Sequence, residues 1–273
     1  MSTESRNPRS FGLDKMSAEE IVRLMNEEEQ IVLRALVHAE HSLASAATKV
    51  AENYLAGGRV VYVGAGTSGR IAKADAAEMP PTFGTDPGRF IAIMAGGDGV
   101  MDKAAEDVED DETAGIEAIN DLELNRKDIV IGLAASGNTP FVVAACRHAH
   151  AKGVWTCGIA NAKKSALLEV VDLPILLDTG PEVLTGSTRL KAGTAQKLAL
   201  NRISTAAMVL SGKVIENLMV DVQAKNHKLK DRCIRIVREL TGVTATEALE
   251  LLESHHWNVR SVLSEHRPSA RAS

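Results

Sequence analysis

Cysteine and aromatic residues are scarce in this sequence, and both shortages exclude classes of protein. The 273 residues include three cysteines, Cys146, Cys157 and Cys233, which are odd in number and widely spaced. That pattern argues against a disulfide framework and against a zinc site. Aromatic residues make up 3% of the chain and the formal net charge is −5. A nucleic-acid surface built from basic and stacking groups is therefore not expected.

Long apolar runs are missing as well. No stretch is long enough to span a bilayer, and residues 1–15 lack the apolar centre of a signal peptide. We therefore expect no membrane partner and a cytoplasmic location. Apolar residues still make up 45% of the chain, which is enough for a sizeable core with a small appendage.

What the sequence does contain is a strand followed by a glycine-rich turn. Val60–Val63 is typical of a strand buried on both faces, and Ile71–Met79 is compatible with a helix. Three glycines lie between them, together with the hydroxyl residues Thr67 and Ser68. A turn of this kind directs backbone N–H groups outward at the positive end of the helix dipole, where an anion such as phosphate binds.

Three interpretations compete for these glycines. A P-loop needs Gly-Lys followed by Ser or Thr, whereas this chain has Gly69-Arg70-Ile71. The dinucleotide pattern matches the glycine spacing, but the acidic residue at the expected distance, Asp86, lies in a proline-rich stretch typical of a loop. The third interpretation is a tight turn that binds no ligand.

Two further hydroxyl-rich loops favour a phosphorylated small molecule over a nucleotide. Asp128–Ala135 is typical of another buried strand, and Ser136–Pro140 follows it before a helix that begins near Phe141. Thr139 can serve as the N-cap of that helix and Pro140 as its first residue. The third loop contains Thr185, Ser187 and Thr188 and precedes another helix. We expect these loops to hold one ligand from neighbouring strands.

The order strand–GxGTSG–helix, strand–xSGxT–helix resembles the SIS (sugar isomerase) phosphosugar-binding fold. Longer stretches resemble one family with this fold, the N-acetylmuramic acid 6-phosphate etherases. Those stretches are Arg6–Pro8, Gly64–Arg70, Asp75–Gly84, Ala134–Pro140, Glu182–Lys197 and Asn217–Val222. The resemblance implies cleavage of the lactyl ether of a phosphorylated amino sugar, releasing D-lactate and N-acetylglucosamine 6-phosphate. It implies no cofactor, no metal and a homodimer.

The expected fold class is α/β. We expect an SIS-type doubly wound parallel sheet with helices on both faces, an N-terminal helical lead-in and a small C-terminal three-helix bundle. The expected divisions are an arm and lead-in at 1–56, the phosphosugar-binding domain at 57–228 and a ubiquitin-associated-like helical module at 229–273. Strands are expected at Arg59–Val63, Phe90–Met94, Asp128–Leu133, Val154–Ile159 and Leu173–Leu177.

Two glutamates are the catalytic candidates. Glu78 precedes Pro80-Pro81, which should end its helix and leave the carboxylate in the last turn, where its protonated form is favoured. Glu109 lies in an acidic run and borders an apolar face marked by Met101, Ala105 and Val108. Each could instead be an exposed surface charge, which is the commoner case. The resemblance assigns Glu78 as the acid and Glu109 as the base.

The expected ligand-binding residues come from the three loops. They are Gly66, Thr67, Ser68, Gly69, Ser136, Gly137, Asn138, Thr139, Ser187, Thr188 and Lys191. Any of the hydroxyls could be an N-cap alone, and Lys191 could pair with the ligand or simply occupy the first turn of its helix. The eight histidines are expected to be structural or exposed.

The sequence departs from the etherase pattern at several places. Asn138 stands where arginine is expected, and the stretch 160–165 lacks the usual Ser-Cys-Asn-Pro-type run. The sequence leaves two other functions open: a phosphosugar isomerase, and a non-catalytic regulator that binds a phosphosugar. The segment Asp75–Gly84 argues against the isomerase, and the lack of a basic recognition helix argues against a DNA-binding regulator.

Overall fold

The chain forms two compact units in a computed structural model that describes residues 3–97, 99, 108–224 and 226–266. The first unit comprises Met1–Ala76 and Gly88–Ala207, and the second comprises Ala77–Pro87 and Met208–Ser273. The expected division at residues 56 and 228 stays a proposal. None of the helices in the described part of the chain is both long and apolar enough to cross a membrane.

A five-stranded parallel sheet forms the centre of the first unit, as the sequence predicts. Its spatial order is β2-β1-β3-β4-β5. The strands are β1 (Val60–Gly64), β2 (Phe90–Met94), β3 (Ile129–Ala134), β4 (Trp155–Ala160) and β5 (Leu173–Leu176). All residues of β1 and β3 are buried, which explains their unbroken apolar sequence. Because β1 and β3 are neighbours, with Gly64 opposite Leu133, the loops that follow them emerge side by side.

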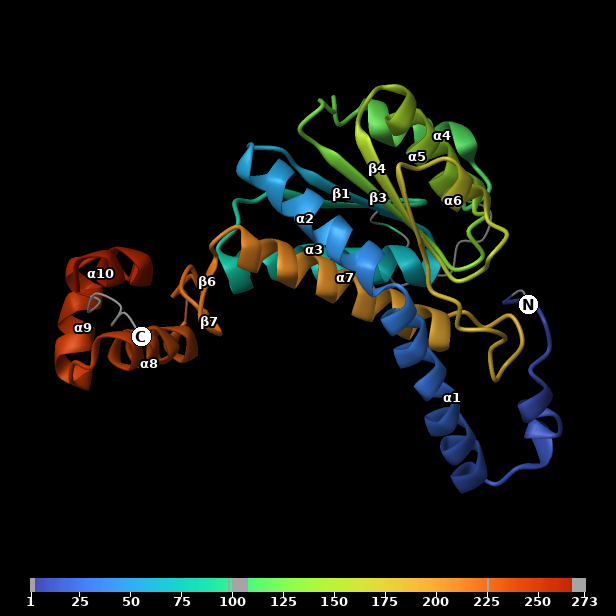
Figure 1. Cartoon of the computed structure of the whole chain (residues 1–273), viewed down its shortest axis with the longest axis horizontal. Helices are drawn as coiled ribbons and strands as arrows, with labels where there is room; N and C mark the ends of the chain where they lie inside the picture. The colour runs from blue at the N-terminus through green and yellow to red at the C-terminus, as the bar shows by residue number, and fades with distance from the viewer. Residues whose placement is uncertain (1–2, 98, 100–107, 225, 267–273) are drawn as a thin grey trace. The chain divides into compact units, whose positions relative to one another are not determined.

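Helices cover both faces of this sheet (Figure 1). One face carries α4 (Glu112–Asn120), α5 (Pro140–Ala151) and α6 (Ala166–Glu169). The other carries α2 (Glu40–Leu55), the first part of α3 (Gly66–Phe83) and α7 (Lys191–Leu210). The doubly wound parallel sheet with helices on both faces, expected from the sequence, is therefore confirmed.

The N-terminal segment folds back along α1. It contains two short 3-10 helices, η1 (Pro8–Ser10) and η2 (Leu13–Lys15), before α1 (Ala18–His38). A capping box starts α1: the Ser17 side chain accepts from the amide of Glu20, and the Glu20 carboxylate accepts from the amide of Ser17. The polar run at residues 26–30 does not break α1, because Glu28 is buried there beside Leu24 and Val32.

Helix α3 continues through Pro80 and Pro81 to Phe83, so the prediction that these prolines end it is wrong. Each proline lacks the N–H that would bond the carbonyl four residues earlier. The helix persists because Met79 and Phe83 are only 2% and 6% exposed, and because the amide of Gly84 donates to the carbonyl of Pro80. Glu78 therefore lies within the helix rather than in its last turn.

A buried polar cluster fixes the first part of α3 in place. The hydroxyl of Tyr62 in β1 donates to Asp75 of α3 at 3.0 Å, and Asn201 and Ser204 of α7 donate to the other carboxylate oxygen. Burial raises the pKa of Asp75 above its ordinary value, and these hydrogen bonds offset part of that rise. The cluster joins a strand and two helices beneath the first glycine-rich turn.

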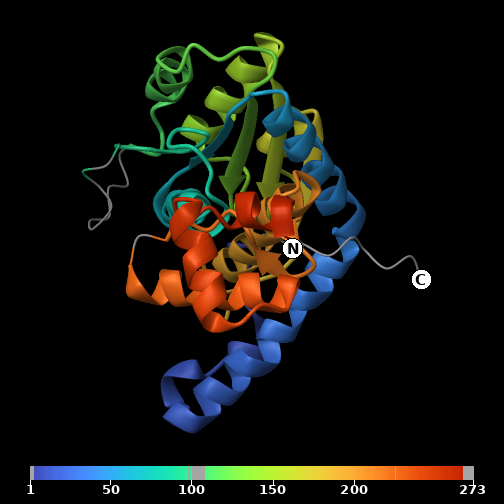
Figure 2. The ribbon, with the colours of Figure 1, turned by 90° about the vertical axis from the view of Figure 1, so that its left-hand side faces the viewer.

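The second unit contains the C-terminal three-helix bundle that the sequence predicts (Figure 2). Its helices are α8 (His227–Thr241), α9 (Ala245–Ser254) and α10 (Val259–His266), and they follow a short hairpin of β6 (Val214–Ile215) and β7 (Leu218–Met219). Its core includes Cys233, Val237 and Leu252, each fully buried. Thr244 and Glu247 form a capping box at the start of α9.

Candidate active site

Three loops of the first unit meet around one cavity of about 220 Å³. The first loop follows β1, the second follows β3, and the third precedes α7, as the sequence predicts. Residues of all three loops line the cavity, together with two carboxylate side chains. The lining consists of Glu4, Ala65, Gly66, Thr67, Ser68, Glu109, Leu133, Ala134, Ala135, Ser136, Thr139 and Thr188.

The first loop is a tight turn that favours glycine. Gly66 has a φ of +51°, in the left-handed region, and α3 begins at this residue. A Cβ added at Gly69 would lie 2.4 Å from the side chain of Met94 in β2. The turn therefore sits directly at the strand ends, and its backbone N–H groups lie at the positive end of the α3 dipole.

The second loop packs against Ser165, which lies in the segment 160–165 that departs from the etherase pattern. Gly137 has a φ of +70°, and a Cβ there would lie 1.9 Å from the hydroxyl of Ser165. Asn138 accepts a hydrogen bond from the amide of Ala166 at 3.0 Å, so it joins this loop to the start of α6. Thr139 is the N-cap of α5, yet its side chain makes no capping hydrogen bond and lines the cavity.

The third loop reaches the first through α7. The amide of Gly193 donates to the carbonyl of Thr188 at 2.9 Å. A Cβ at Gly193 would lie 3.4 Å from the methyl group of Thr67. Thr67 of the first loop therefore lies against the start of α7, the helix that the third loop precedes.

Glu109 lies over the first loop. It belongs to a turn at residues 108–110 before α4. A Cβ added at Gly66 would lie 2.9 Å from its Oε1 atom. Its carbonyl accepts a hydrogen bond from the amide of Phe141 at 3.1 Å, which ties the turn to the start of α5. Met101 and Ala105, which were expected to mark the apolar face beside Glu109, lie outside the described residues.

Glu78 lies elsewhere on α3. Its side chain is exposed, it belongs to the part of α3 that groups with the second unit, and it is not among the residues that line the cavity. The assignment of Glu78 as the acid therefore stays a proposal that rests on the family pattern.

Of the eleven ligand-binding candidates, six line the cavity: Gly66, Thr67, Ser68, Ser136, Thr139 and Thr188. Gly69, Gly137, Asn138 and Ser187 lie in the same loops without lining it. The sequence reasoning missed Glu4, which also lines the cavity. The segment Arg6–Pro8, close in the chain to the cavity residue Glu4, was the available signal.

Lys191 occupies the first turn of α7, which is one of its two expected positions. Its side chain is only 2% exposed, and its Nζ atom lies 2.5 Å from Oε2 of Glu28 in α1. Glu28 also accepts hydrogen bonds from Asn7 at 2.7 Å and from Arg9 at 2.9 Å. The buried pair therefore joins α1, α7 and the N-terminal segment.

A second buried carboxylate, Glu182, caps α7. Its two oxygens accept hydrogen bonds from the amides of Lys191 and Ala192 at 3.0 and 2.9 Å. Burial raises the pKa of Glu182 above its ordinary value despite these bonds. Burial also opposes the charge on Glu28, but hydrogen bonds from Lys191 and Asn7 and the charge of Arg9 outweigh it, so the pKa of Glu28 is lowered.

We expect Lys191→Met to lower the free energy of unfolding by about 3–5 kcal/mol, because it leaves the Glu28 carboxylate buried without its partner. Denaturant unfolding measures the change. The matched control is Lys163→Met, because Lys163 pairs with Asp178 at 3.1 Å with 64% and 39% of the two side chains exposed. That control should change the value by at most about 1 kcal/mol. Equal losses in both variants would contradict a structural role for the buried pair.

In the part of the chain that the structure describes, one group of side chains has the spacing of metal ligands: His255, Glu265 and His266 of the second unit. His255 and His266 contact the same carboxylate oxygen of Glu265 at 3.2 and 3.9 Å, as in an ordinary surface ion pair. The cavity lining contains hydroxyls, carboxylates and backbone groups, and no histidine or cysteine among its described residues. This donor set suits a phosphorylated sugar.

Comparison with known proteins identifies relatives that match nearly the whole chain. A family model described as the glucokinase regulatory protein N-terminal SIS domain matches residues 42–150. An N-acetylmuramic acid 6-phosphate etherase from Lactobacillus acidophilus is 47% identical over 259 residues, which are 95% of this chain and 87% of that protein. One from Geobacillus thermodenitrificans is 47% identical over 96% of this chain and 89% of its own length. One from Staphylococcus aureus is 45% identical over 94% and 86%.

Solved structures with the same fold are more distant in sequence. A phosphoheptose isomerase from Neisseria gonorrhoeae has a TM-score of 0.50 at 20% identity, and the match covers 72% of this chain and 100% of that one. A phosphoheptose isomerase from Francisella tularensis has a TM-score of 0.51 at 17% identity, covering 72% and 100%. At this level of identity the match establishes the fold alone.

Proposed function

The chain belongs to the N-acetylmuramic acid 6-phosphate etherases, which are carbon–oxygen lyases, and we propose that the three-loop cavity is where it cleaves the D-lactyl ether of its substrate. The products are N-acetylglucosamine 6-phosphate and D-lactate. The reaction belongs to the recycling and catabolism of cell-wall amino sugars.

The phosphate of the substrate binds to the loop residues. Hydroxyls of Thr67, Ser68, Ser136, Thr139 and Thr188 line the cavity and donate to the phosphate oxygens, together with the backbone N–H groups at the start of α3. Gly69, Gly137, Asn138 and Ser187 shape these loops. Lys191 supports the third loop through its buried pair with Glu28. The phosphate then orients the sugar from its non-reacting end.

Two carboxyl groups suffice for the chemistry. In the ring-opened sugar, the C1 aldehyde acidifies the C2 proton, and Glu109 removes it as the base. The C3–O bond then breaks, and Glu78 protonates the departing lactate oxygen as the acid. Water adds to the resulting double bond, with its hydroxyl at C3 and a proton at C2, so the net reaction consumes one water. Opposite protonation states allow the two groups to divide these roles.

The observation that carries this proposal is the position of Glu109. Its carboxylate oxygen lies against Gly66, in the same cavity as the hydroxyls that would hold the phosphate. A base so close to the anion site can act on a sugar whose phosphate is bound there. Incubating the purified protein with N-acetylmuramic acid 6-phosphate should release D-lactate, measured with a coupled lactate assay. Binding without release would favour a phosphosugar-binding regulator, and aldose–ketose interconversion would favour an isomerase.

A homodimer forms part of the proposal. An apolar groove of about 620 Å³ in the first unit is lined by α1, α2 and α7. Leu33 and Val37, which line it, are 56% and 68% exposed, although both are large aliphatic residues. Exposed apolar patches of this kind favour association with a second surface. We propose that a second copy of this chain covers the groove.

Val37→Glu should convert the dimer to a monomer, because it places a charge in the proposed contact. Light scattering coupled to size-exclusion chromatography measures the mass. The matched control is Val22→Glu on the same helix, because Val22 is 56% exposed and lies outside the groove. The control should leave the mass unchanged. A wild-type protein that is monomeric at all concentrations would contradict the dimer.

We propose the cytoplasm as the compartment. The cysteines Cys146, Cys157 and Cys233 are all buried free thiols. Burial raises the pKa of Cys146 to about 12, which keeps it in the unreactive thiol form. Buried free thiols without disulfides are the ordinary state of proteins in a reducing compartment.

A further inference from the structure

The cavity contains a second carboxylate that the mechanism above does not use. Glu4 of the N-terminal segment lines the cavity beside Thr188. A Cβ added at Gly186 would lie 3.1 Å from its Oε2 atom. The carboxylate of Glu4 therefore lies against the third loop, whereas that of Glu109 lies against the first. Its residue is exposed, as expected for a group that opens onto a solvent-filled site.

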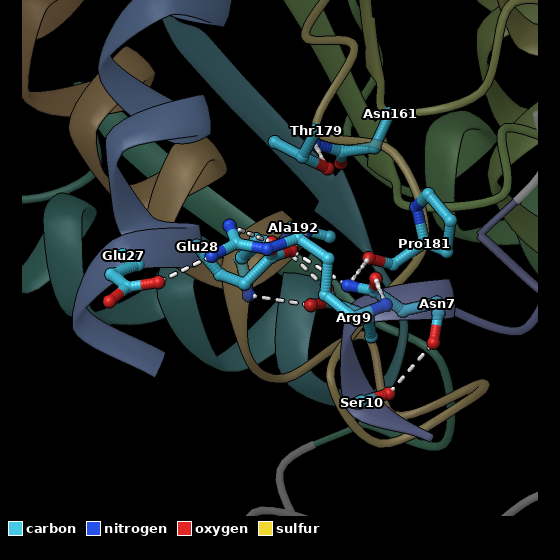
Figure 3. Close-up of polar contacts among 11 residues, drawn as sticks. Asn7, Arg9, Ser10, Glu27, Glu28, Asn161, Thr179, Pro181 and Ala192 are labelled. Atoms are coloured by element: carbon cyan, nitrogen blue, oxygen red, sulfur yellow. Dashed lines mark hydrogen bonds and ion pairs between the residues drawn. The ribbon is translucent and has the colours of Figure 1, made fainter. Parts of the chain in front are cut away.

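The N-terminal segment is held in place, so the position of Glu4 is not that of a frayed terminus. Thr3 and Asn7, on either side of Glu4, are only 2% and 4% exposed. The side-chain amide of Asn7 donates to Glu28 at 2.7 Å and to the carbonyl of Pro181 at 3.3 Å (Figure 3). Pro181 belongs to the segment that leads into the third loop. Asn7 therefore ties the N-terminal segment that carries Glu4 both to Glu28, the partner of Lys191, and to the segment before the third loop.

The charge of Glu4 restricts what it can bind. An ionised carboxylate only accepts hydrogen bonds, and it repels a phosphate group. The hydroxyl-lined loops already provide donors for the phosphate. Glu4 therefore suits the uncharged donors of the same ligand, which in an amino sugar are the ring hydroxyls and the amide N–H.

We propose that Glu4 is a substrate-binding residue that accepts hydrogen bonds from the sugar, so that the site selects amino sugar 6-phosphates over bare phosphate. This inference rests on the proposed function, because it assumes that the loops hold the phosphate. It assigns the N-terminal segment a direct part in the site. A different role, in which Glu4 occupies the anion position and must be displaced, makes the opposite prediction for affinity.

The test is calorimetric binding of two probes, N-acetylglucosamine 6-phosphate and inorganic phosphate, to the full chain and its variants. For Glu4→Ala we expect affinity for the sugar phosphate to fall about 10- to 100-fold, as for the loss of a hydrogen bond to a charged group. Affinity for inorganic phosphate should stay the same or rise. Glu4→Gln keeps one acceptor oxygen and should lose less. The matched control is Asp14→Ala, an exposed acid of the same segment outside the cavity lining, which should change neither affinity.

Unchanged or tighter binding of the sugar phosphate by Glu4→Ala would overturn the inference, and tighter binding of both probes would indicate the displaced-anion role. Equal losses for both probes with a lower melting temperature would also overturn it, because they would show a purely structural role. The comparison needs no turnover. Failure of the wild type to release D-lactate would therefore count against the proposed function, whereas the binding data for Glu4→Ala would still decide whether Glu4 binds the sugar.

Discussion

Glu109→Gln should lower the rate of D-lactate release by a factor of about 100 to 10,000, which is the usual contribution of a positioned acid or base. Glutamine has nearly the same shape but cannot accept the C2 proton. The loop hydroxyls stay in place, so affinity for N-acetylglucosamine 6-phosphate should change little. A loss confined to kcat is the expected result, because the base acts in the chemical step.

Asp110→Asn is the matched control for this change. Asp110 is the next residue in the same acidic turn, but it is exposed and does not line the cavity. It should keep full activity. If both variants lost activity equally, the effect would come from the charge of the turn rather than from a base at Glu109. Full activity in Glu109→Gln would exclude the base role.

Glu78→Gln should also nearly abolish D-lactate release while phosphosugar binding stays intact. An amide cannot protonate the departing lactate oxygen, and the expected loss is again about 100- to 10,000-fold. A substrate analogue with a better leaving group at C3 should recover much of the lost rate, because such a group needs less help from an acid. That recovery would not occur in the Glu109 variant, so kinetics with the analogue separate the two roles.

The control for Glu78 is Asp86→Asn, an exposed acid in the loop after α3. It should leave the rate unchanged. Because Glu78 is exposed and outside the cavity lining, this experiment is the direct test of its role. Normal turnover by Glu78→Gln would remove it from the mechanism and leave the cavity carboxylates as the remaining candidates for the acid.

The sequence predicts the sheet well because its strands are local features. Unbroken apolar runs such as Val60–Val63 are typical of strands buried on both faces, and the runs that form β1 and β3 are each followed by a turn rich in glycine and hydroxyl residues. The adjacency of the first two loops follows from the parallel sheet, in which β1 and β3 pair directly. The approach of α7 to the first loop, at Gly193 and Thr67, depends on how α7 packs and has no local signal.

Other features could not be predicted because distant residues determine them. In the sequence, Glu28 looks like one of several surface acids. It lies four residues after Leu24 and four before Val32, however, and so shares the buried face of α1 with them. Its partners make that burial possible: Lys191, which is 163 residues away, together with Asn7 and Arg9. Pro80 and Pro81 are local helix-ending signals, but the burial of Met79 and Phe83 outweighs them. The position of Glu4 in the cavity depends on how the N-terminal segment packs near the third loop, so a local sequence pattern could not predict it.

The central claim is that the three loops hold the phosphate of an amino sugar so that Glu109 reaches its C2 proton. A crystal structure of the protein with bound N-acetylglucosamine 6-phosphate tests this most directly. We expect the phosphate among the hydroxyls of Ser68, Ser136, Thr139 and Thr188, with the Glu109 carboxylate within hydrogen-bonding distance of the C2 region. A phosphate bound outside this cavity, or a sugar ring turned away from Glu109, would contradict the account.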